Sequence, residues 1–256
     1  MIEIVQSLPL IQDISPKDTM YTGDKDHYFR VGASALRCIQ SAMFISNRDR
    51  FDRILDFPCG HGRVARHLRS AFPDAQLVVA DLDRDAVDFC AETFGAMPVY
   101  SSNNTQEISV EGSFDLIWCG SLLTHFDAER CLEFLSFFRR LLLPNGILIF
   151  TMHGRLSSFW LKEGQYIYGL EQEKVPNILE SYDSEGFGYL DYPGSQGYGI
   201  SVALPSWTLS QLEKMDDITL VSYTEMGWDN HQDVVACMRS TKTMIWSARK
   251  QASSEN

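Results

Sequence analysis

Short apolar runs alternate along the chain with stretches in which apolar residues recur every three or four positions. The apolar runs predict strands at residues 53–56, 76–80, 97–100, 114–119 and, after a turn at 144–146, 147–152. The helical spacing predicts helices at residues 64–72, 86–93 and about 127–143. Apolar strands separated by amphipathic helices are typical of a parallel sheet covered on both faces. We therefore expect an α/β protein with a doubly wound, mostly parallel sheet.

Two more strands are expected near the C-terminus, at Ile218–Tyr223 and Asp233–Met238. The short polar stretch 225–232 joins them, which predicts a C-terminal antiparallel hairpin. A helix is expected to precede the hairpin and to run to about Met215, with Ser206 as its N-cap. The hairpin brings the predicted sheet to seven strands.

The N-terminal region is expected to be an arm, residues 1–29, followed by a helix from Val31 to about Ile45. The main domain then covers residues 30–250, and residues 251–256 are expected to be a disordered tail. Two interpretations of the arm stay open. It is a leader to a packing helix, or it folds over a ligand and contacts it through Tyr28 and Arg30.

The main domain carries an insertion at about residues 156–203, which is rich in glycine and tyrosine and has weak periodicity. A segment of this length without clear secondary structure is more often a lid or a binding loop than an idle connection. We expect the insertion to border the binding site, and a purely structural insertion is the alternative.

The composition restricts the kind of partner. A net charge of −12 at pH 7 argues against nucleic acid, because nucleic-acid binding needs a basic face. The six cysteines lie in apolar segments without CxxC spacing, which indicates reduced thiols of a cytoplasmic protein. The N-terminus lacks the features of a signal peptide, and no stretch has the length of a membrane span. We therefore expect a soluble protein that does not insert into a membrane.

The turn after the first strand carries the clearest chemical signal. Asp56 ends the strand, and Gly60 and Gly62 follow in the turn. Glycine allows φ > 0 and lets the backbone come close to a bound molecule. Asp81, at the end of the second strand, occupies the usual place of a ribose-binding acid.

A nicotinamide cofactor and S-adenosylmethionine are both compatible with this turn. A carboxylate at Asp56 suits the ammonium group of a methionine moiety better than it suits a pyrophosphate. The predicted antiparallel hairpin is also not required by a purely parallel dinucleotide-binding fold. Both features favour S-adenosylmethionine.

With these features, the chain resembles the class I S-adenosylmethionine-dependent methyltransferases, which have a seven-stranded, Rossmann-like methyltransferase fold. The resemblance covers roughly residues 30–152 and resumes in the hairpin after 204. It implies that Asp56, Gly60 and Gly62 hold the methionine end of the cofactor. It also implies that the carboxylate of Asp81 binds both ribose hydroxyls.

The same resemblance places further residues near the cofactor. The loop after the third strand, residues 101–104, departs from the family pattern because it lacks an acidic residue. The end of the fourth strand resembles the family's segment that lines the methyl-transfer point. The further expected cofactor contacts are Leu82, which lies beside the adenine, and Pro58, Cys59, Ser102, Asn103, Cys119, Tyr28 and Arg30.

A general base is expected at the carboxyl ends of the strands, where such folds place their sites. His125 follows the fourth strand, His153 follows the fifth, and Asp229 and His231 lie in the hairpin joint. Each also has a structural interpretation, such as the start of a helix at His125. Histidines with carboxylates can bind a metal, but their spacing here matches no ligand signature, so we expect no metal site.

The sequence therefore predicts a methyltransferase that moves a methyl group from S-adenosyl-L-methionine to an oxygen or nitrogen of a small molecule or glycan. The resemblance is to bacterial small-molecule and glycan methyltransferases. A nicotinamide-dependent oxidoreductase and a non-catalytic S-adenosylmethionine-binding module are the alternatives.

Overall fold

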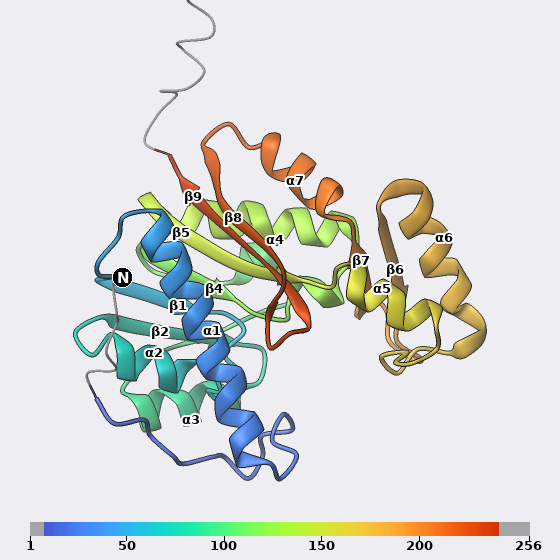
Figure 1. The fold of residues 1–256 in the computed structure, drawn as a ribbon. Coiled ribbons are helices and arrows are strands. Elements are labelled where there is room, and N and C mark those ends of the chain that lie inside the picture. Colours follow the sequence, from blue (N-terminus) through green and yellow to red (C-terminus); the bar gives the residue numbers. More distant parts are fainter. Residues whose placement is uncertain (1–7, 241–256) are drawn as a thin grey trace, which may run out of the picture.

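A seven-stranded sheet forms the centre of the computed structural model, which describes residues 8–240 (Figure 1). The helices and strands are, in order, α1 (Lys25–Ile45), β1 (Arg53–Asp56), α2 (Ala65–Ala71), β2 (Gln76–Asp81), α3 (Arg84–Phe94), β3 (Met97–Tyr100), β4 (Phe114–Cys119), α4 (Ala128–Leu141), β5 (Leu142–Met152), α5 (Arg155–Lys162), α6 (Val175–Glu185), β6 (Phe187–Asp191), β7 (Gly199–Ala203), α7 (Pro205–Glu213), β8 (Ile218–Trp228) and β9 (Gln232–Arg239). Short 3-10 helices occur at η1 (Thr105–Glu107), η2 (Leu123–His125) and η3 (Gln172–Lys174).

The strand order is β3-β2-β1-β4-β5-β9-β8. β1 pairs in parallel with β2 and β4, and β4 pairs in parallel with β5. β9 runs antiparallel to both β5 and β8. The predicted fold class, including the C-terminal antiparallel hairpin, is confirmed. The strand order reverses between β1 and β4, which is where open α/β sheets form a crevice at their carboxyl edge.

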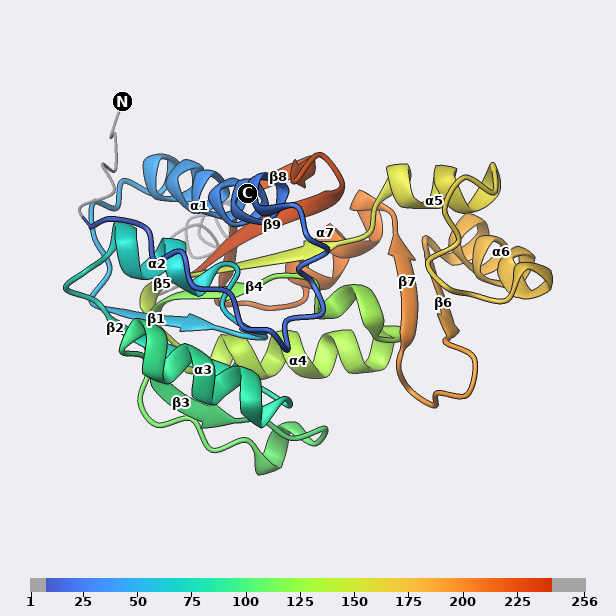
Figure 2. The same ribbon diagram turned by 90° about the horizontal axis from the view of Figure 1, so that it is seen from below.

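Helices cover both faces of this sheet (Figure 2). Ile54 packs in one buried cluster with residues of α1, α2 and α3. The next residue, Leu55, packs in a second cluster with residues of α4 and α7. Successive side chains of a strand point to opposite faces, so a strand buried on both sides is apolar at every position.

Two of the predicted boundaries in the sheet are wrong. β5 begins at Leu142, so the predicted turn at 144–146 lies inside the strand, where Asn145 has φ +63° and the register with β4 shifts. β8 continues to Trp228, so the hairpin turn is shorter than the predicted joint. In both places the strand bulges through residues that a periodicity argument assigns to turns, and pairing resumes beyond them, at Ile147 and at Trp228.

The starts of two helices also differ from the prediction. α1 begins at Lys25 and not at Val31, because the Asp24 carboxylate caps it by accepting a hydrogen bond from the backbone N–H of His27 (2.9 Å). Ser206 is not the N-cap of α7. The helix begins at Pro205, whose fixed φ suits the first helical position.

The insertion has secondary structure of its own, contrary to the expectation of a segment without clear elements. β6 and β7 pair in a separate two-stranded sheet, and α6 packs beside them. Ile178 of α6 and Ile200 of β7 belong to a third buried cluster. These elements lie at one side of the main sheet (Figure 1).

The predicted tail, 251–256, lies outside the described residues, as do the first seven residues of the predicted arm. Within residues 8–240, no helix combines the length and the apolar character needed to cross a membrane.

Candidate active site

The turn after β1 depends on its two glycines for different reasons. Gly62 has φ +82°, and a Cβ there would lie 2.2 Å from Cε2 of Phe94 on α3. Gly60 has φ +48°, and a Cβ there would meet no heavy atom within 4 Å. Packing against α3 therefore requires the second glycine. The first glycine leaves open space beside the backbone.

Asp56, at the end of β1, is an unpaired buried carboxylate. Its side chain is 1% exposed, and neither carboxylate oxygen has a hydrogen-bond partner among the described residues. Burial, followed by the nearby charge of Asp81, raises the pKa of Asp56 well above its usual value. A buried carboxylate without a partner is costly, and a cationic group of a ligand offsets that cost. Asp56 therefore fits the ammonium group of a methionine moiety.

Asp81 connects the end of β2 to the glycine turn. Its Oδ2 accepts a hydrogen bond from the backbone N–H of Gly60 (2.8 Å), and its Oδ1 accepts one from the backbone N–H of Asp83 (3.0 Å). A carboxylate has further lone pairs available for a diol. Leu82 follows directly and is 55% exposed, so its apolar side chain is available to a planar group.

Three other expected cofactor contacts lie at the carboxyl edge of the sheet. The peptide bond before Pro58 is cis, and the backbone N–H of Cys59 donates to the carbonyl oxygen of Ala80 (2.9 Å). Cys119, at the end of β4, is fully buried, and burial raises the pKa of its thiol well above the usual value. The Cys119 thiol is therefore not a nucleophile at neutral pH.

The loop after β3 is held by an acidic residue that the sequence analysis did not identify. Glu107 accepts hydrogen bonds from the hydroxyl of Ser102 (2.7 Å) and from the amide of Asn104 (3.2 Å). Arg130 of α4 donates to the carbonyl and side-chain oxygens of Asn103 (3.1 and 3.2 Å). Glu107 was missed because it lies beyond the segment in which the family resemblance places an acid.

Two expected cofactor contacts, Tyr28 and Arg30, are not among the residues that line the cavity described below. Tyr28 is buried in α1, and its hydroxyl donates to Oδ2 of Asp18 in the arm (2.6 Å). Arg30 is exposed on the same helix. The arm and α1 contribute Met20 and Val31 to the cavity instead.

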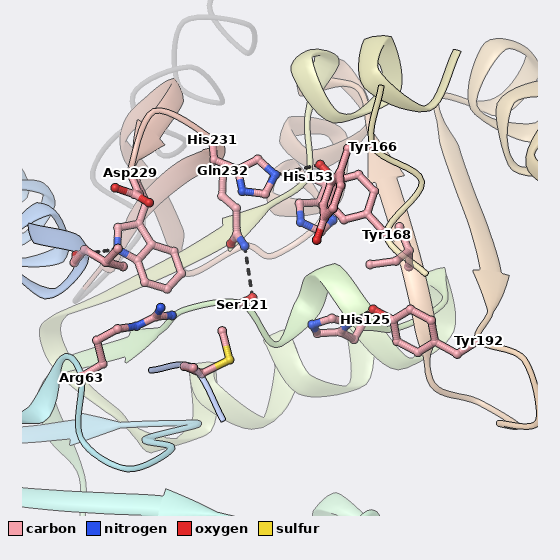
Figure 3. Close-up of a pocket in the computed structure, with 14 residues that line it drawn as sticks. Arg63, Ser121, His125, His153, Tyr166, Tyr168, Tyr192, Asp229, His231 and Gln232 are labelled. Atoms are coloured by element: carbon pink, nitrogen blue, oxygen red, sulfur yellow. Dashed lines mark hydrogen bonds between the residues drawn. The ribbon is translucent and has the colours of Figure 1, made fainter. Parts of the chain in front are cut away.

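The four residues predicted to be catalytic all line one cavity of about 260 Å³ at the carboxyl edge of the sheet (Figure 3). His125 comes from η2, His153 follows β5, and Asp229 and His231 come from the hairpin turn. The insertion adds three tyrosines to the wall, which are Tyr166, Tyr168 and Tyr192. The fold thus brings together side chains that are far apart in the sequence.

The three histidines of the cavity are neutral at pH 7. Burial lowers the pKa of His125 and of His231, and it lowers the pKa of His153 well below the usual value, with the charges of the other two histidines adding to the effect. The rings of His153 and His231 stack with their centroids 5.2 Å apart. A neutral imidazole can act as a base through an unprotonated ring nitrogen that no hydrogen bond occupies.

Hydrogen bonds assign the tautomer of one of these histidines. Nδ1 of His125 lies 2.9 Å from the carbonyl oxygen of Gly199, which can only accept a hydrogen bond. The Nδ1 atom of the neutral ring therefore carries the proton, and Nε2 is left as an acceptor. Within residues 8–240, no hydrogen bond occupies Nε2 of His125. At His153, Nδ1 is buried and has no partner among the described residues.

Asp229 faces the cavity, but its carboxylate is already engaged. Its Oδ2 lies 3.1 Å from Nε2 of His27 on α1, and its backbone N–H donates to the hydroxyl of Ser34 (3.0 Å). These contacts attach the hairpin turn to α1. Asp229 is thus less free to take a proton than the three histidines are.

The cavity also contains three polar residues that the sequence analysis did not single out. Arg63, in the glycine turn, places its guanidinium over the ring of Trp228 (5.7 Å), and in the described part of the chain no hydrogen bond or ion pair holds it. Ser121 and Gln232 are joined by a 3.1 Å hydrogen bond, although 111 positions separate them in the sequence. No local pattern indicates such a pair, because it exists only once β4 and β9 lie on either side of β5.

Comparisons with known proteins agree with this geometry. Residues 55–148 match the family model of a methyltransferase domain. A curated malonyl-[acyl-carrier protein] O-methyltransferase from Legionella pneumophila is 27% identical over 143 residues, which cover 53% of this chain and 50% of that protein. The chain thus matches about half the length of this curated relative.

Two solved structures illustrate the likeness in fold. An S-adenosylmethionine-dependent methyltransferase from Clostridium acetobutylicum superposes with a TM-score of 0.54 at 14% identity, covering 86% of this chain and 93% of that chain. The plantazolicin methyltransferase BpumL, in complex with a pentazolic desmethyl analogue and S-adenosylhomocysteine, superposes with a TM-score of 0.55 at 13% identity, covering 87% and 88%. Residues 55–148 therefore match a methyltransferase domain, and the chain has the fold of the class I, S-adenosylmethionine-dependent methyltransferases.

Proposed function

We propose that this protein transfers a methyl group from S-adenosylmethionine to an oxygen or nitrogen atom of a small molecule or glycan. One observation carries the proposal. The unpaired carboxylate of Asp56 and the glycine turn lie at the same edge of the sheet as a cavity lined by three neutral histidines. This edge of the sheet thus has a carboxylate that can bind a cationic methyl donor. It also has imidazoles that can take a proton from the molecule that is methylated.

The residues present fit the methyl donor. Asp56 would bind its ammonium group, Asp81 its ribose hydroxyls, and Leu82 would lie against its adenine. Arg63 would bind its carboxylate, because this guanidinium faces the cavity and makes no hydrogen bond or ion pair within residues 8–240. When bound, S-adenosylmethionine supplies a methyl group activated by the sulfonium charge.

The chain itself supplies the positioning and the proton acceptor. Methyl transfer is a displacement that depends mainly on alignment, so the walls of the cavity contribute by holding the acceptor in place and by excluding water. We assign the role of base to His125, because its Nε2 is the nitrogen that the tautomer leaves unprotonated and unbonded among the described residues. His153 and His231 would shape the same wall.

Binding measurements test the donor site. Calorimetry should show that the purified protein binds S-adenosylhomocysteine, and NAD should not compete. Asp81→Ala should weaken binding at least tenfold, whereas Asp74→Ala, an exposed carboxylate outside the site, should leave it unchanged. Binding of NAD without binding of S-adenosylhomocysteine would favour the oxidoreductase. Donor binding with no methyl transfer to any of a broad panel of acceptors would favour the non-catalytic module.

We also propose a reducing, cytoplasmic environment for the protein. All six cysteines lie in the described range and are free thiols, and five of them are buried. Free thiols at this density persist where the medium keeps them reduced.

A further inference from the structure

The active-site cavity has two chemically different ends (Figure 3). Arg63 and Asp229 lie at one end, beside the glycine turn and α1. The rings of His125, His153 and Tyr168 lie at the other end, beside the insertion. The hydrogen bond between Ser121 and Gln232 lies between the two ends, at the carboxyl end of β4.

The histidine and tyrosine end carries no formal charge. Of the residues that line the cavity, the charged ones are Arg63 and Asp229, and both lie at the opposite end. The buried carboxylate of Asp233 is engaged by the hydroxyl of Tyr223 (2.7 Å) and by the backbone N–H of Met226 (2.9 Å). A charged acceptor would lose its hydration at this end without gaining a counter-charge, which is unfavourable. The chemistry of the wall therefore selects an uncharged group.

The size of the cavity limits the acceptor group to about one ring. The volume of about 260 Å³ must hold the reacting end of the donor together with the acceptor. An apolar cavity of ~150 Å³ in another protein holds one benzene molecule. The walls are flat, because imidazole and phenol rings form them, and the ring of Tyr168 lies nearly parallel to that of His231, at 15°. A single six-membered ring matches this space.

The polar pair between the two ends is rigidly held. Ser121 has φ +58°, a conformation that a residue with a side chain rarely adopts. Its backbone N–H donates to the hydroxyl of Thr151 (2.8 Å), which in turn donates to the side-chain oxygen of Gln232 (2.6 Å). The amide nitrogen of Gln232 gives one hydrogen to the hydroxyl of Ser121 and retains a second. Strained residues fixed by several contacts are characteristic of ligand sites.

The spare hydrogen of Gln232 distinguishes an oxygen acceptor from a nitrogen acceptor. A hydroxyl oxygen has two lone pairs, so it can accept a hydrogen bond from the amide and still attack with the other pair. A neutral amine has a single lone pair and cannot do both. The arrangement therefore favours a hydroxyl group.

We propose that the histidine and tyrosine end binds an uncharged six-membered ring that bears a hydroxyl group, a phenol or a sugar, and that Gln232 and Ser121 hold the reacting oxygen. This inference rests on the proposed function. In the transfer, a carbon–oxygen bond forms as the sulfur–methyl bond breaks, the electron pair remains on sulfur, and the hydroxyl proton passes to Nε2 of His125.

Matched probes test the inference on protein saturated with S-adenosylhomocysteine, with binding measured by calorimetry and ligand-observed NMR. Phenol or methyl glucoside should bind at least tenfold more tightly than benzoate and benzylammonium. Phenol should also bind more tightly than toluene, which has the same ring without the hydroxyl. Tighter binding of phenol would identify the ring as aromatic, and tighter binding of methyl glucoside would identify it as a sugar.

Variants locate the hydroxyl site. Gln232→Leu should reduce the preference for phenol over toluene to less than twofold while leaving the affinity for S-adenosylhomocysteine unchanged. Gln211→Leu, at a buried glutamine of α7 outside the cavity, should not change either quantity. The comparison of the two probes on the unmodified protein stands even if the variant does not fold.

Three results would overturn the inference. These are stronger binding of benzoate or benzylammonium, equal binding of phenol and toluene, and no binding of any probe to the loaded protein. Failure of S-adenosylhomocysteine itself to bind would instead refute the proposed function, and with it this inference.

Discussion

The hydroxyl of Tyr168 lies 2.7 Å from Nε2 of His231. Burial raises the pKa of Tyr168, so the phenol stays protonated, and we assign its O–H as the donor in this hydrogen bond to the imidazole. The bond joins the insertion to the hairpin turn across the cavity. With Nε2 as the acceptor, the neutral form of His231 carries its proton on Nδ1. The insertion thus forms part of the cavity wall.

Removing this hydroxyl should raise the pKa of His231. A hydrogen bond to the unprotonated nitrogen favours the neutral ring, so its loss in Tyr168→Phe favours protonation. NMR titration of the histidine resonances measures the change. Tyr166→Phe is the matched control, because Tyr166 lines the same cavity but is 55% exposed. An unchanged pKa of His231 in Tyr168→Phe would contradict the assigned direction of the bond.

Methyl transfer should remain active below the ordinary pKa of histidine. Because burial lowers the pKa of His125, the base stays unprotonated as the pH falls through ~6.5 and is lost only below that value. The acid limb of kcat/KM, measured with the acceptor that the probe panel identifies, should therefore have its midpoint below ~6.5. A midpoint above 7 would exclude His125 as the base. His125→Gln should remove most of the activity without changing donor affinity.

The sheet could be predicted from the sequence because its strands are locally distinct. Arg53–Asp56, Met97–Tyr100 and Phe114–Cys119 were predicted with the residues that the structure assigns to β1, β3 and β4. Each is a short segment with apolar residues at its centre, and polar or glycine residues lie at or near both of its ends. The elements of the insertion were missed, because β6 and β7 are five-residue strands that each contain a glycine, and α6 has only three buried residues to mark its helical spacing.

The active site could be predicted only in part, for a related reason. The glycine turn is a local pattern, and the three histidines were found from their places at strand ends. The roles of Arg63, Ser121 and Gln232 depend on neighbours that the fold supplies from other elements. Tyr28 stays a predicted cofactor contact; its ring is buried in α1, and its hydroxyl donates to Asp18 of the arm.

Stability should fall in mild acid because of a histidine outside the active site. His67 in α2 is 2% exposed, and burial, together with the charge of Arg66, lowers its pKa to about 4. The unfolded state therefore binds a proton near pH ~6.5 and the folded state only near pH 4. Between these values the free energy of unfolding should decrease by up to ~3 kcal/mol. Denaturant titrations from pH 7 to 4 should show a smaller decrease for His67→Leu, and an equal decrease would contradict the assignment.

Asp56→Asn should affect stability and donor binding in opposite directions. At pH 8 the substitution removes an unpaired buried charge, so the free energy of unfolding of the ligand-free protein should rise by ~1–3 kcal/mol. The affinity for S-adenosylhomocysteine should fall at least tenfold, because the ammonium group loses its partner. Asp74→Asn should change neither quantity by a measurable amount. A loss of stability with unchanged affinity would mean that Asp56 has a structural role only.

The two glycines of the turn should respond differently to alanine. Gly62→Ala places a methyl group against Phe94 and keeps φ positive, so it should destabilise the protein by ~2–4 kcal/mol in denaturant titrations.

Gly60→Ala should lower the free energy of unfolding by only ~1 kcal/mol, because its methyl group meets open space. It should nevertheless weaken S-adenosylhomocysteine binding at least tenfold. Gly164→Ala is the matched control: its φ is +64°, its surroundings are equally open, and it follows α5, outside the glycine turn. It should show the same small cost in stability and no change in affinity. Equal affinities for the Gly60 and Gly164 variants would mean that the open space beside the turn is not where the donor binds.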